Sequence, residues 1–237
     1  MKKHIPNTIT SMNLLCGILG VVFTFEGRFD LAFYLMLAGA VFDFCDGLSA
    51  RALGAYSKMG VELDSLADMV TFGVLPSVML YKLMRICTYS MSVWCFVPLL
   101  IAVFSGLRLA KFNVDDRQSE NFLGMATPVC AMICGSLAYF IAHEPDSFLS
   151  TWASDFVFIP VLSVLMCALL VCEIPMFSMK FKKGQEKVLR NKRICFAINI
   201  LLVVGVVIAL GLDWSLAILL TFVFYLLMNV VYAICKI

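Results

Sequence analysis

The stretch Asp43–Asp68, DFCDGLSARALGAYSKMGVELDSLAD, organises the chain because it places four carboxylates among apolar residues. Asp43 and Asp46 are spaced i,i+3, and Asp64 and Asp68 are spaced i,i+4, so each pair shares one face of a helix. A carboxylate in a membrane helix costs about 2.5–3.5 kcal/mol on insertion scales. Four that face one another also repel strongly. We therefore expect the two pairs to meet around two divalent cations.

The ligand types indicate which cations these are. Carboxylate oxygens are hard ligands that favour Mg²⁺ or Mn²⁺ over Zn²⁺. Two such ions commonly bind a phosphate or diphosphate group. Between the acid pairs, Gly47 and Gly60 lack a Cβ and let a bulky ligand approach the backbone, and Arg51 adds positive charge for a phosphate.

A second interpretation of membrane aspartates is a proton or cation pathway, as in a divalent-cation transporter. In that case Gly54 and Gly60 are helix-packing glycines, and Arg51 is an anchor on the cytoplasmic side. The glycines and the arginine have no role in an ion path, however, so we prefer the phosphate site.

The composition indicates a membrane protein. The 237 residues are 62% hydrophobic and 14% charged, with a mean hydropathy of +0.96, and a water-soluble domain this apolar could not cover its surface. The ten cysteines are scattered singly, which is typical of small buried apolar residues. We expect no nucleic-acid partner. Lys2 and Lys3 before an apolar run resemble a signal peptide, but no small-residue cleavage site follows, so we expect a retained first membrane helix.

The expected fold is all-α, a polytopic transmembrane bundle of about eight spans with antiparallel neighbours. The expected spans are residues 8–25, 31–55, 61–83, 92–112, 125–142, 155–175, 194–211 and 214–236. A basic cytoplasmic loop is expected at 176–193. We expect the last two spans, within 194–237, to be packing or oligomer-facing helices, which leaves a homodimer open.

Lys and Arg counting predicts the orientation. With a cytoplasmic N-terminus, fifteen of the 18 basic residues lie on the cytoplasmic side, and only Arg28, Lys82 and Arg85 lie on the other. We therefore expect an integral protein of the inner (cytoplasmic) membrane, with both termini and the Asp43–Asp68 site facing the cytoplasm. The basic loop could also attract anionic lipid headgroups.

The acidic stretch resembles the signature of the CDP-alcohol phosphatidyltransferase family. The matching pattern is Asp43-x2-Asp46-Gly47-x2-Ala50-Arg51-x8-Gly60-x3-Asp64-x3-Asp68. Its flanks resemble the branch of the family that uses serine: Ile5-Pro6-Asn7-Thr8 with Asn13, the run 67–76, and the run 107–113, in which Lys111 replaces the usual Arg. The resemblance covers about residues 5–175.

The resemblance implies a six-helix core at 1–175 that transfers the phosphatidyl group from CDP-diacylglycerol to L-serine, giving phosphatidylserine and CMP. By the family pattern, the four aspartates hold two divalent cations, Mg²⁺ or Mn²⁺, and Asp68 is also the general base. The residues implied for nucleotide or CDP-lipid binding are Gly47, Ala50, Arg51, Gly60 and Asn13.

Two further points concern the acceptor. Arg108 and Lys111 are the expected contacts to the acceptor or the lipid phosphate. A related transferase with glycerol 3-phosphate or an inositol as acceptor would share the whole acidic motif, so that alternative stays open.

All-oxygen ligation predicts a defined response to metal removal. EDTA is expected to abolish transferase activity, and Mg²⁺ or Mn²⁺ to restore it. The measurement is the initial rate in washed membranes after chelation and re-addition of each ion. Restoration by Zn²⁺ alone would contradict the expected site.

Overall fold

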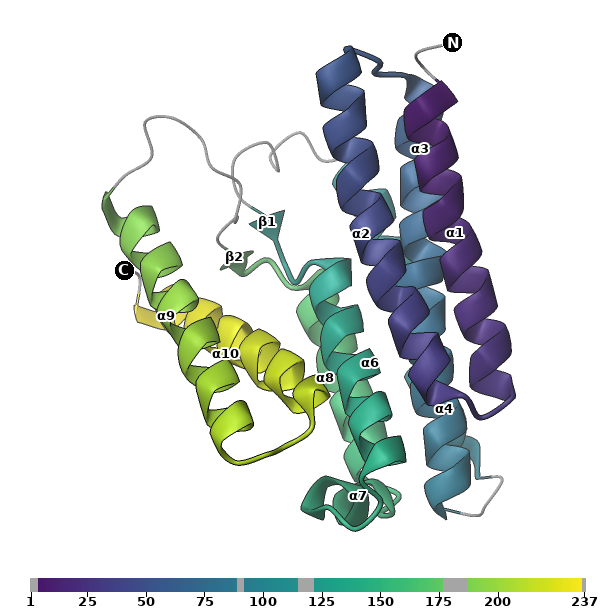
Figure 1. Cartoon of the computed structure of the whole chain (residues 1–237), viewed down its shortest axis with the longest axis vertical. Coiled ribbons are helices and arrows are strands. Elements are labelled where there is room, and N and C mark those ends of the chain that lie inside the picture. The colour runs from purple at the N-terminus through teal and green to yellow at the C-terminus, as the bar shows by residue number, and fades with distance from the viewer. Residues whose placement is uncertain (1–3, 89–91, 115–121, 177–186, 236–237) are drawn as a thin grey trace.

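The computed structural model describes residues 4–88, 92–114, 122–176 and 187–235. Helices make up nearly all of this part of the chain, which confirms the all-α class (Figure 1). A two-stranded pairing was not predicted. Strand β1 (Phe122–Leu123) lies antiparallel to β2 (Pro175–Met176) and ties the segment before α6 to the segment after α8.

The first half of the chain forms three long helical segments. They are α1 (His4–Phe25), α2 (Phe29–Leu53) and a continuous segment made of α3 (Lys58–Asp68), the π-helical turn η1 (Met69–Val74) and α4 (Leu75–Thr88). In Figure 1 they lie side by side, with the α2–α3 loop at the same end as the N-terminus. The π-helical turn begins directly after Asp68, and π turns are frequent at functional sites.

The second half supplies the remaining helices. They are η2 (Val93–Leu99, 3₁₀), α5 (Leu100–Val114), α6 (Thr127–His143), α7 (Phe148–Ala153), α8 (Phe158–Val171), α9 (Lys187–Ala209) and α10 (Trp214–Cys235). Figure 1 shows α9 and α10 on the opposite side of α6 from α1.

Five helical segments are long and apolar enough to cross a membrane, so this is a membrane protein. They are His4–Phe25, Phe29–Leu53, Lys58–Thr88, Val93–Val114 and Trp214–Tyr232. The other three expected spans coincide with shorter apolar helices, Thr127–His143, Phe158–Val171 and Ile194–Ala209.

One expected boundary was wrong. The loop expected at 176–193 is helical from Lys187 onward, because the good helix formers Lys, Leu and Arg extend α9 beyond its apolar part. Residues 177–186 of that loop lie outside the described part of the chain.

Two glycines allow α1 and α2 to approach η1 closely. A Cβ added at Gly17 of α1 would lie 2.5 Å from Thr71 Oγ1, and one added at Gly39 of α2 would lie 2.6 Å from Thr71 Cγ2. Between them, the Thr71 hydroxyl donates to the main-chain oxygen of Asn13 at 3.0 Å. This contact sets the depth at which the aspartates of α2 and α3 meet.

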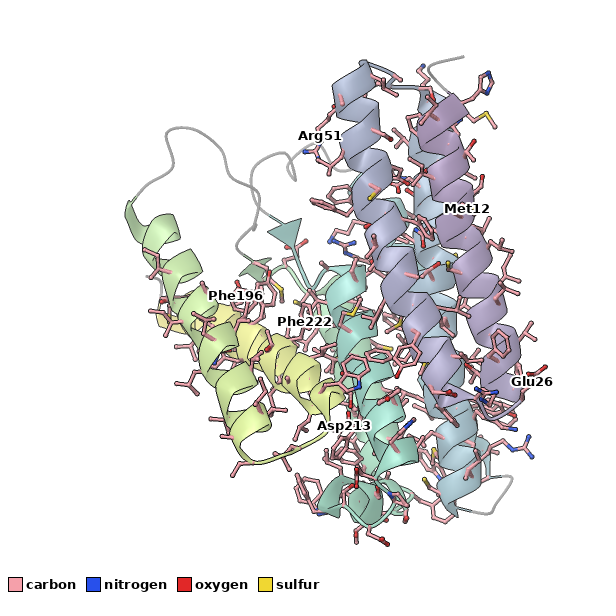
Figure 2. All side chains as sticks on the ribbon, viewed as in Figure 1. Met12, Glu26, Arg51, Phe196, Asp213 and Phe222 are labelled. Carbon is pink, nitrogen blue, oxygen red and sulfur yellow. The ribbon has the colours of Figure 1, made fainter. Side chains whose placement is uncertain are left out.

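Aromatic packing attaches α10 to the bundle. The Trp214 ring stacks on Tyr34 of α2, with centroids 5.9 Å apart, and on Phe33 at 5.6 Å. It also lies 5.2 Å from Tyr139 of α6, a helix that is almost wholly buried. Figure 2 shows Asp213, just before α10, next to this end of α6. The last helix is therefore packed on the core that α2 and α6 share.

The close approach at Gly17 can be tested by substitution. Gly17→Ala is expected to cost about 1–3 kcal/mol, because the new Cβ also meets Thr71 Cα, 2.9 Å away, in a backbone that cannot move alone. The apparent Tm in detergent should fall by about 2–10 °C. Gly205→Ala in α9 is the matched control, since an added Cβ there meets nothing within 4 Å. An equal change in both variants would refute the packing argument.

Candidate functional site

Three aspartates from two helices form a carboxylate cluster. Asp43 of α2 and Asp64 and Asp68 of α3 each place one carboxylate oxygen within 4.8 Å of the others, and all three are half-buried. The i,i+4 spacing puts Asp64 and Asp68 on the same face of α3, toward α2. The structure thus brings three of the four expected aspartates together.

The fourth aspartate lies beside this cluster and does not belong to it. Asp46 is 6% exposed, and its Oδ2 accepts a hydrogen bond of 2.6 Å from the Thr10 hydroxyl of α1. It still interacts electrostatically with Asp68. Sequence reasoning missed Thr10, although Thr10 and Asn13 are polar and lie one helical turn apart in α1.

Asn13 holds Asp68 from the α1 side. Its side chain is fully buried, and Nδ2 donates to Asp68 Oδ1 at 3.3 Å. Its Oδ1 makes no hydrogen bond to any residue that the structure describes. The family resemblance implies that Asn13 binds the nucleotide or CDP-lipid. The structure places its amide on Asp68 of the carboxylate cluster, and Asn13 does not line the neighbouring cavity.

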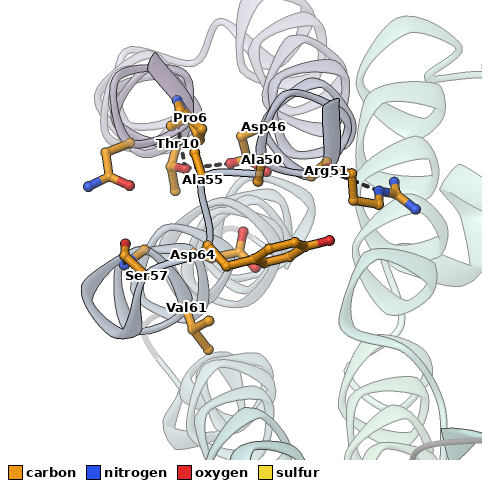
Figure 3. Close-up of a pocket in the computed structure, with 13 residues that line it drawn as sticks. Pro6, Thr10, Asp46, Ala50, Arg51, Ala55, Ser57, Val61 and Asp64 are labelled. Carbon is orange, nitrogen blue, oxygen red and sulfur yellow. Dashed lines mark hydrogen bonds between the residues drawn. The ribbon is translucent and has the colours of Figure 1, made fainter. Parts of the chain in front are cut away.

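That cavity, of about 300 Å³, opens between α1, α2 and α3 (Figure 3). Every motif residue expected around the nucleotide lines it: Gly47, Ala50, Arg51 and Gly60, together with Asp46 and Asp64. Sequence reasoning missed the rest of the wall, which is Pro6, Asn7, Thr10, Ala55, Tyr56, Ser57 and Val61. Asp64 belongs to both the cavity and the carboxylate cluster, so the two are continuous.

The glycines fit their expected role at this wall. A Cβ at Gly60 would lie 3.0 Å from Ser57 Oγ and 3.1 Å from Asn7 Oδ1, which would narrow the cavity. Gly47 leaves open space, because the nearest atom to an added Cβ is Arg51 Nη2 at 3.8 Å. Arg51 Nε donates to the main-chain oxygen of Gly47 at 2.9 Å, which holds the arginine stem along the cavity.

The two basic residues of α5 lie in different surroundings. Arg108 is 9% exposed, donates from Nη1 to Thr127 Oγ1 at 2.9 Å, and interacts electrostatically with Asp68. Lys111 is exposed, and its Nζ pairs with Glu173 Oε1 at 3.2 Å. Surface pairs of this kind contribute about 0–1 kcal/mol. Of these two residues, only Arg108 is buried and within electrostatic range of Asp68.

The C-terminal helix lies near Arg108. Tyr225 of α10 is buried, packs edge-on against Phe196 of α9 with ring centroids 5.5 Å apart, and lies within electrostatic range of Arg108. From the sequence, α9 and α10 are expected to be packing or oligomer-facing helices. A tyrosine within an apolar helix gives no motif by which the sequence could have revealed that α10 lies near Arg108.

The cluster suits a hard divalent cation. Its three carboxylates are like charges held close together in partly buried positions, an arrangement that a cation stabilises. Carboxylate oxygens alone are the ligand set of Mg²⁺ and Mn²⁺. The donor chemistry therefore fits the expected metal.

Comparison with known proteins agrees with the motif. The sequence profile of the CDP-alcohol phosphatidyltransferase family matches residues 3–175. A CDP-diacylglycerol–serine O-phosphatidyltransferase of Bacillus subtilis is 36% identical over 137 residues, which cover 58% of this chain and 76% of that protein. The Mycobacterium leprae protein of the same name is 38% identical over 183 residues, 74% of this chain and 58% of its own length. An archaetidylserine synthase of Methanothermobacter thermautotrophicus is 32% identical over 164 residues, 68% of this chain and 66% of its own.

Cation binding at the cluster predicts thermal stabilisation. At about 100 times its Kd, Mn²⁺ should stabilise the folded protein by about 2.7 kcal/mol and raise the apparent Tm by several degrees. Asp64→Asn should remove most of that shift. Asp155→Asn, at an exposed position between α7 and α8, should keep it. A full Mn²⁺ shift in the Asp64 variant would place the cation elsewhere.

Proposed function

Because the chain belongs to the CDP-alcohol phosphatidyltransferase family, we propose that it transfers the phosphatidyl group of CDP-diacylglycerol to L-serine, giving phosphatidylserine and CMP. The similarity to proteins named CDP-diacylglycerol–serine O-phosphatidyltransferase supports serine as the acceptor. In this proposal the protein is a phospholipid-synthesising membrane enzyme.

One observation carries the proposal. The fold collects the signature residues into two connected spaces, a cavity walled by Gly47, Ala50, Arg51 and Gly60 and a carboxylate cluster that shares Asp64 with it. An ion pathway would need the acids but not this walled cavity beside them. The arrangement therefore favours a nucleotide–diphosphate site over a divalent-cation transporter.

Asp43, Asp64 and Asp68 would hold divalent cations, with Asp46 as a further ligand beside them; two ions, Mg²⁺ or Mn²⁺, are the number that the family pattern implies. Bound there, such cations neutralise the diphosphate and make CMP a good leaving group. Thr10 would hold the Asp46 carboxylate at the cavity wall, and Asn13 would hold Asp68 in the cluster.

In the proposed reaction, Asp68 removes the proton from the serine hydroxyl. The hydroxyl oxygen forms a bond to the phosphorus that carries diacylglycerol, and the bond from that phosphorus to the oxygen of CMP breaks. Arg108, which is buried and within electrostatic range of Asp68, would pair with the serine carboxylate. The proposal leaves Lys111 out of the acceptor site because Lys111 already pairs with Glu173.

The membrane arrangement is part of the same proposal. We place the protein in the cytoplasmic membrane, with both termini and the cavity on the cytoplasmic side, because fifteen of 18 basic residues then lie there. The six-helix core at 1–175 and the homodimer stay predictions.

An acceptor assay tests the proposal. Membranes containing the protein are incubated with CDP-diacylglycerol, Mn²⁺ and each of three labelled acceptors: L-serine, glycerol 3-phosphate and myo-inositol. Labelled phosphatidylserine is expected, together with an equal amount of CMP. A labelled lipid formed only from another acceptor would identify a related transferase, and no CMP with any acceptor would reject the enzyme class.

Substitution of single aspartates separates the base from the remaining ligands. Asp68→Asn keeps the shape but removes the base, so turnover should fall by at least about 10²–10⁴-fold. CMP binding should suffer less, because Asp43, Asp46 and Asp64 remain. Asp64→Asn should lose CMP binding and turnover together, since Asp64 belongs to both the cavity and the cluster. The measurements are initial rates and Mn²⁺-dependent CMP binding by purified variants, and near-normal turnover of Asp68→Asn would require another base.

A further inference from the structure

An exposed aromatic side chain lies at the cavity wall and is not one of the signature residues. Tyr56 lies in the four-residue loop between α2 and α3, lines the cavity, and is 67% exposed. Its neighbours in the cavity wall are Ala55 and Ser57, and Arg51 lies five residues earlier.

The loop holds the backbone on both sides of Tyr56. Gly54 adopts the left-handed conformation (φ 58°) as the C-cap of α2, and the Ala55 N–H donates to the oxygen of Ala50 at 3.0 Å. Ala55 is buried, at 6% exposure. On the other side, Ser57 caps α3 by accepting from the Gly60 N–H at 3.0 Å. The ring is thus presented from a fixed backbone without being packed into the core.

The position of this ring matches one end of the proposed substrate. In a CDP-lipid the diphosphate separates the acyl chains from the base. With the diphosphate at the carboxylate cluster, the acyl chains must extend into the bilayer, so the base extends the other way, toward the end of the bundle where α2 and α3 are joined. Tyr56 is at that end.

We propose that Tyr56 binds the nucleotide by stacking its ring on the cytosine base. This inference rests on the proposed function and adds a residue that contacts the substrate at the far side from the reacting atoms. Stacking of a base on an aromatic side chain is worth about 1–3 kcal/mol. Because it acts on the base and not on the phosphates, it should leave the diphosphate contacts unchanged.

An exposed tyrosine at the end of a membrane helix can also be an interfacial anchor. An anchor needs apolar bulk near the headgroups, whereas stacking needs a flat ring. Tyr56→Leu keeps bulk and removes the ring, and Tyr56→Phe keeps both, so the two variants separate these roles.

The test measures binding of labelled CMP to purified protein in Mn²⁺ by equilibrium dialysis, and its displacement by unlabelled CMP or by pyrophosphate. Tyr56→Leu should weaken CMP binding about tenfold or more. The affinity of this variant for pyrophosphate should stay unchanged. That affinity is measured by competition against a metal-bound fluorescent phosphate probe. Tyr56→Phe should bind CMP nearly as the unchanged protein does. Met59→Ala, at a 71% exposed position outside the cavity wall, is the control for the loop region and should change neither affinity.

Each other outcome overturns the inference. Unchanged CMP affinity in Tyr56→Leu would leave the residue an interfacial anchor, and parallel losses for CMP and pyrophosphate would mean that it only shapes the phosphate site. Failure of the unchanged protein to bind CMP would instead remove the proposed function itself, and with it the premise. Elution of each variant as a single peak in size-exclusion chromatography shows that it is folded.

Discussion

The mutual repulsion of half-buried carboxylates is the constraint on which the rest of this structure depends. Oxygens of Asp43, Asp64 and Asp68 lie within 4.8 Å of one another, between helices that also face lipid. Such an arrangement is stable only where neighbouring groups hold each carboxylate and where positive charge can be bound. The Asn13 amide holds the Asp68 carboxylate by a hydrogen bond. The carboxylate oxygens of the cluster are suited to binding a divalent cation.

The glycine contacts of α1 and α2 serve this same constraint. Gly17 and Gly39 allow both helices to lie against Thr71, the third residue of η1. At this level Asn13 donates to Asp68, and Asp68 lies beside Asp43. A larger residue at either glycine would separate the helices that carry the acids. Packing deep in the bundle thus determines the geometry of the polar site near its end.

Asp64 and Asp68 divide the site into two sides. They are four residues apart, about 6 Å along the axis of α3. Asp64 faces the cavity with Arg51 and Gly60, while Asp68 is the acid that interacts with Arg108. A nucleotide on the first side and an acceptor on the second would meet at the carboxylates between them. Tyr225 of α10 is buried within electrostatic range of Arg108, so the last helix lies near this second side.

The sequence by itself determined the membrane class, the helical segments and the acid pairs, because hydropathy and the 3.6-residue period act locally along the chain. It also identified Gly47, Ala50, Arg51 and Gly60 as one group, and the structure places all four on one cavity. Only the tertiary structure decided that Asp46 accepts from Thr10, that Arg108 binds Thr127 while Lys111 pairs with Glu173, and that Tyr225 lies near Arg108. These contacts join residues that lie far apart in the chain or on different faces of one helix. Their partners are selected by how the helices pack against one another, which no local pattern records.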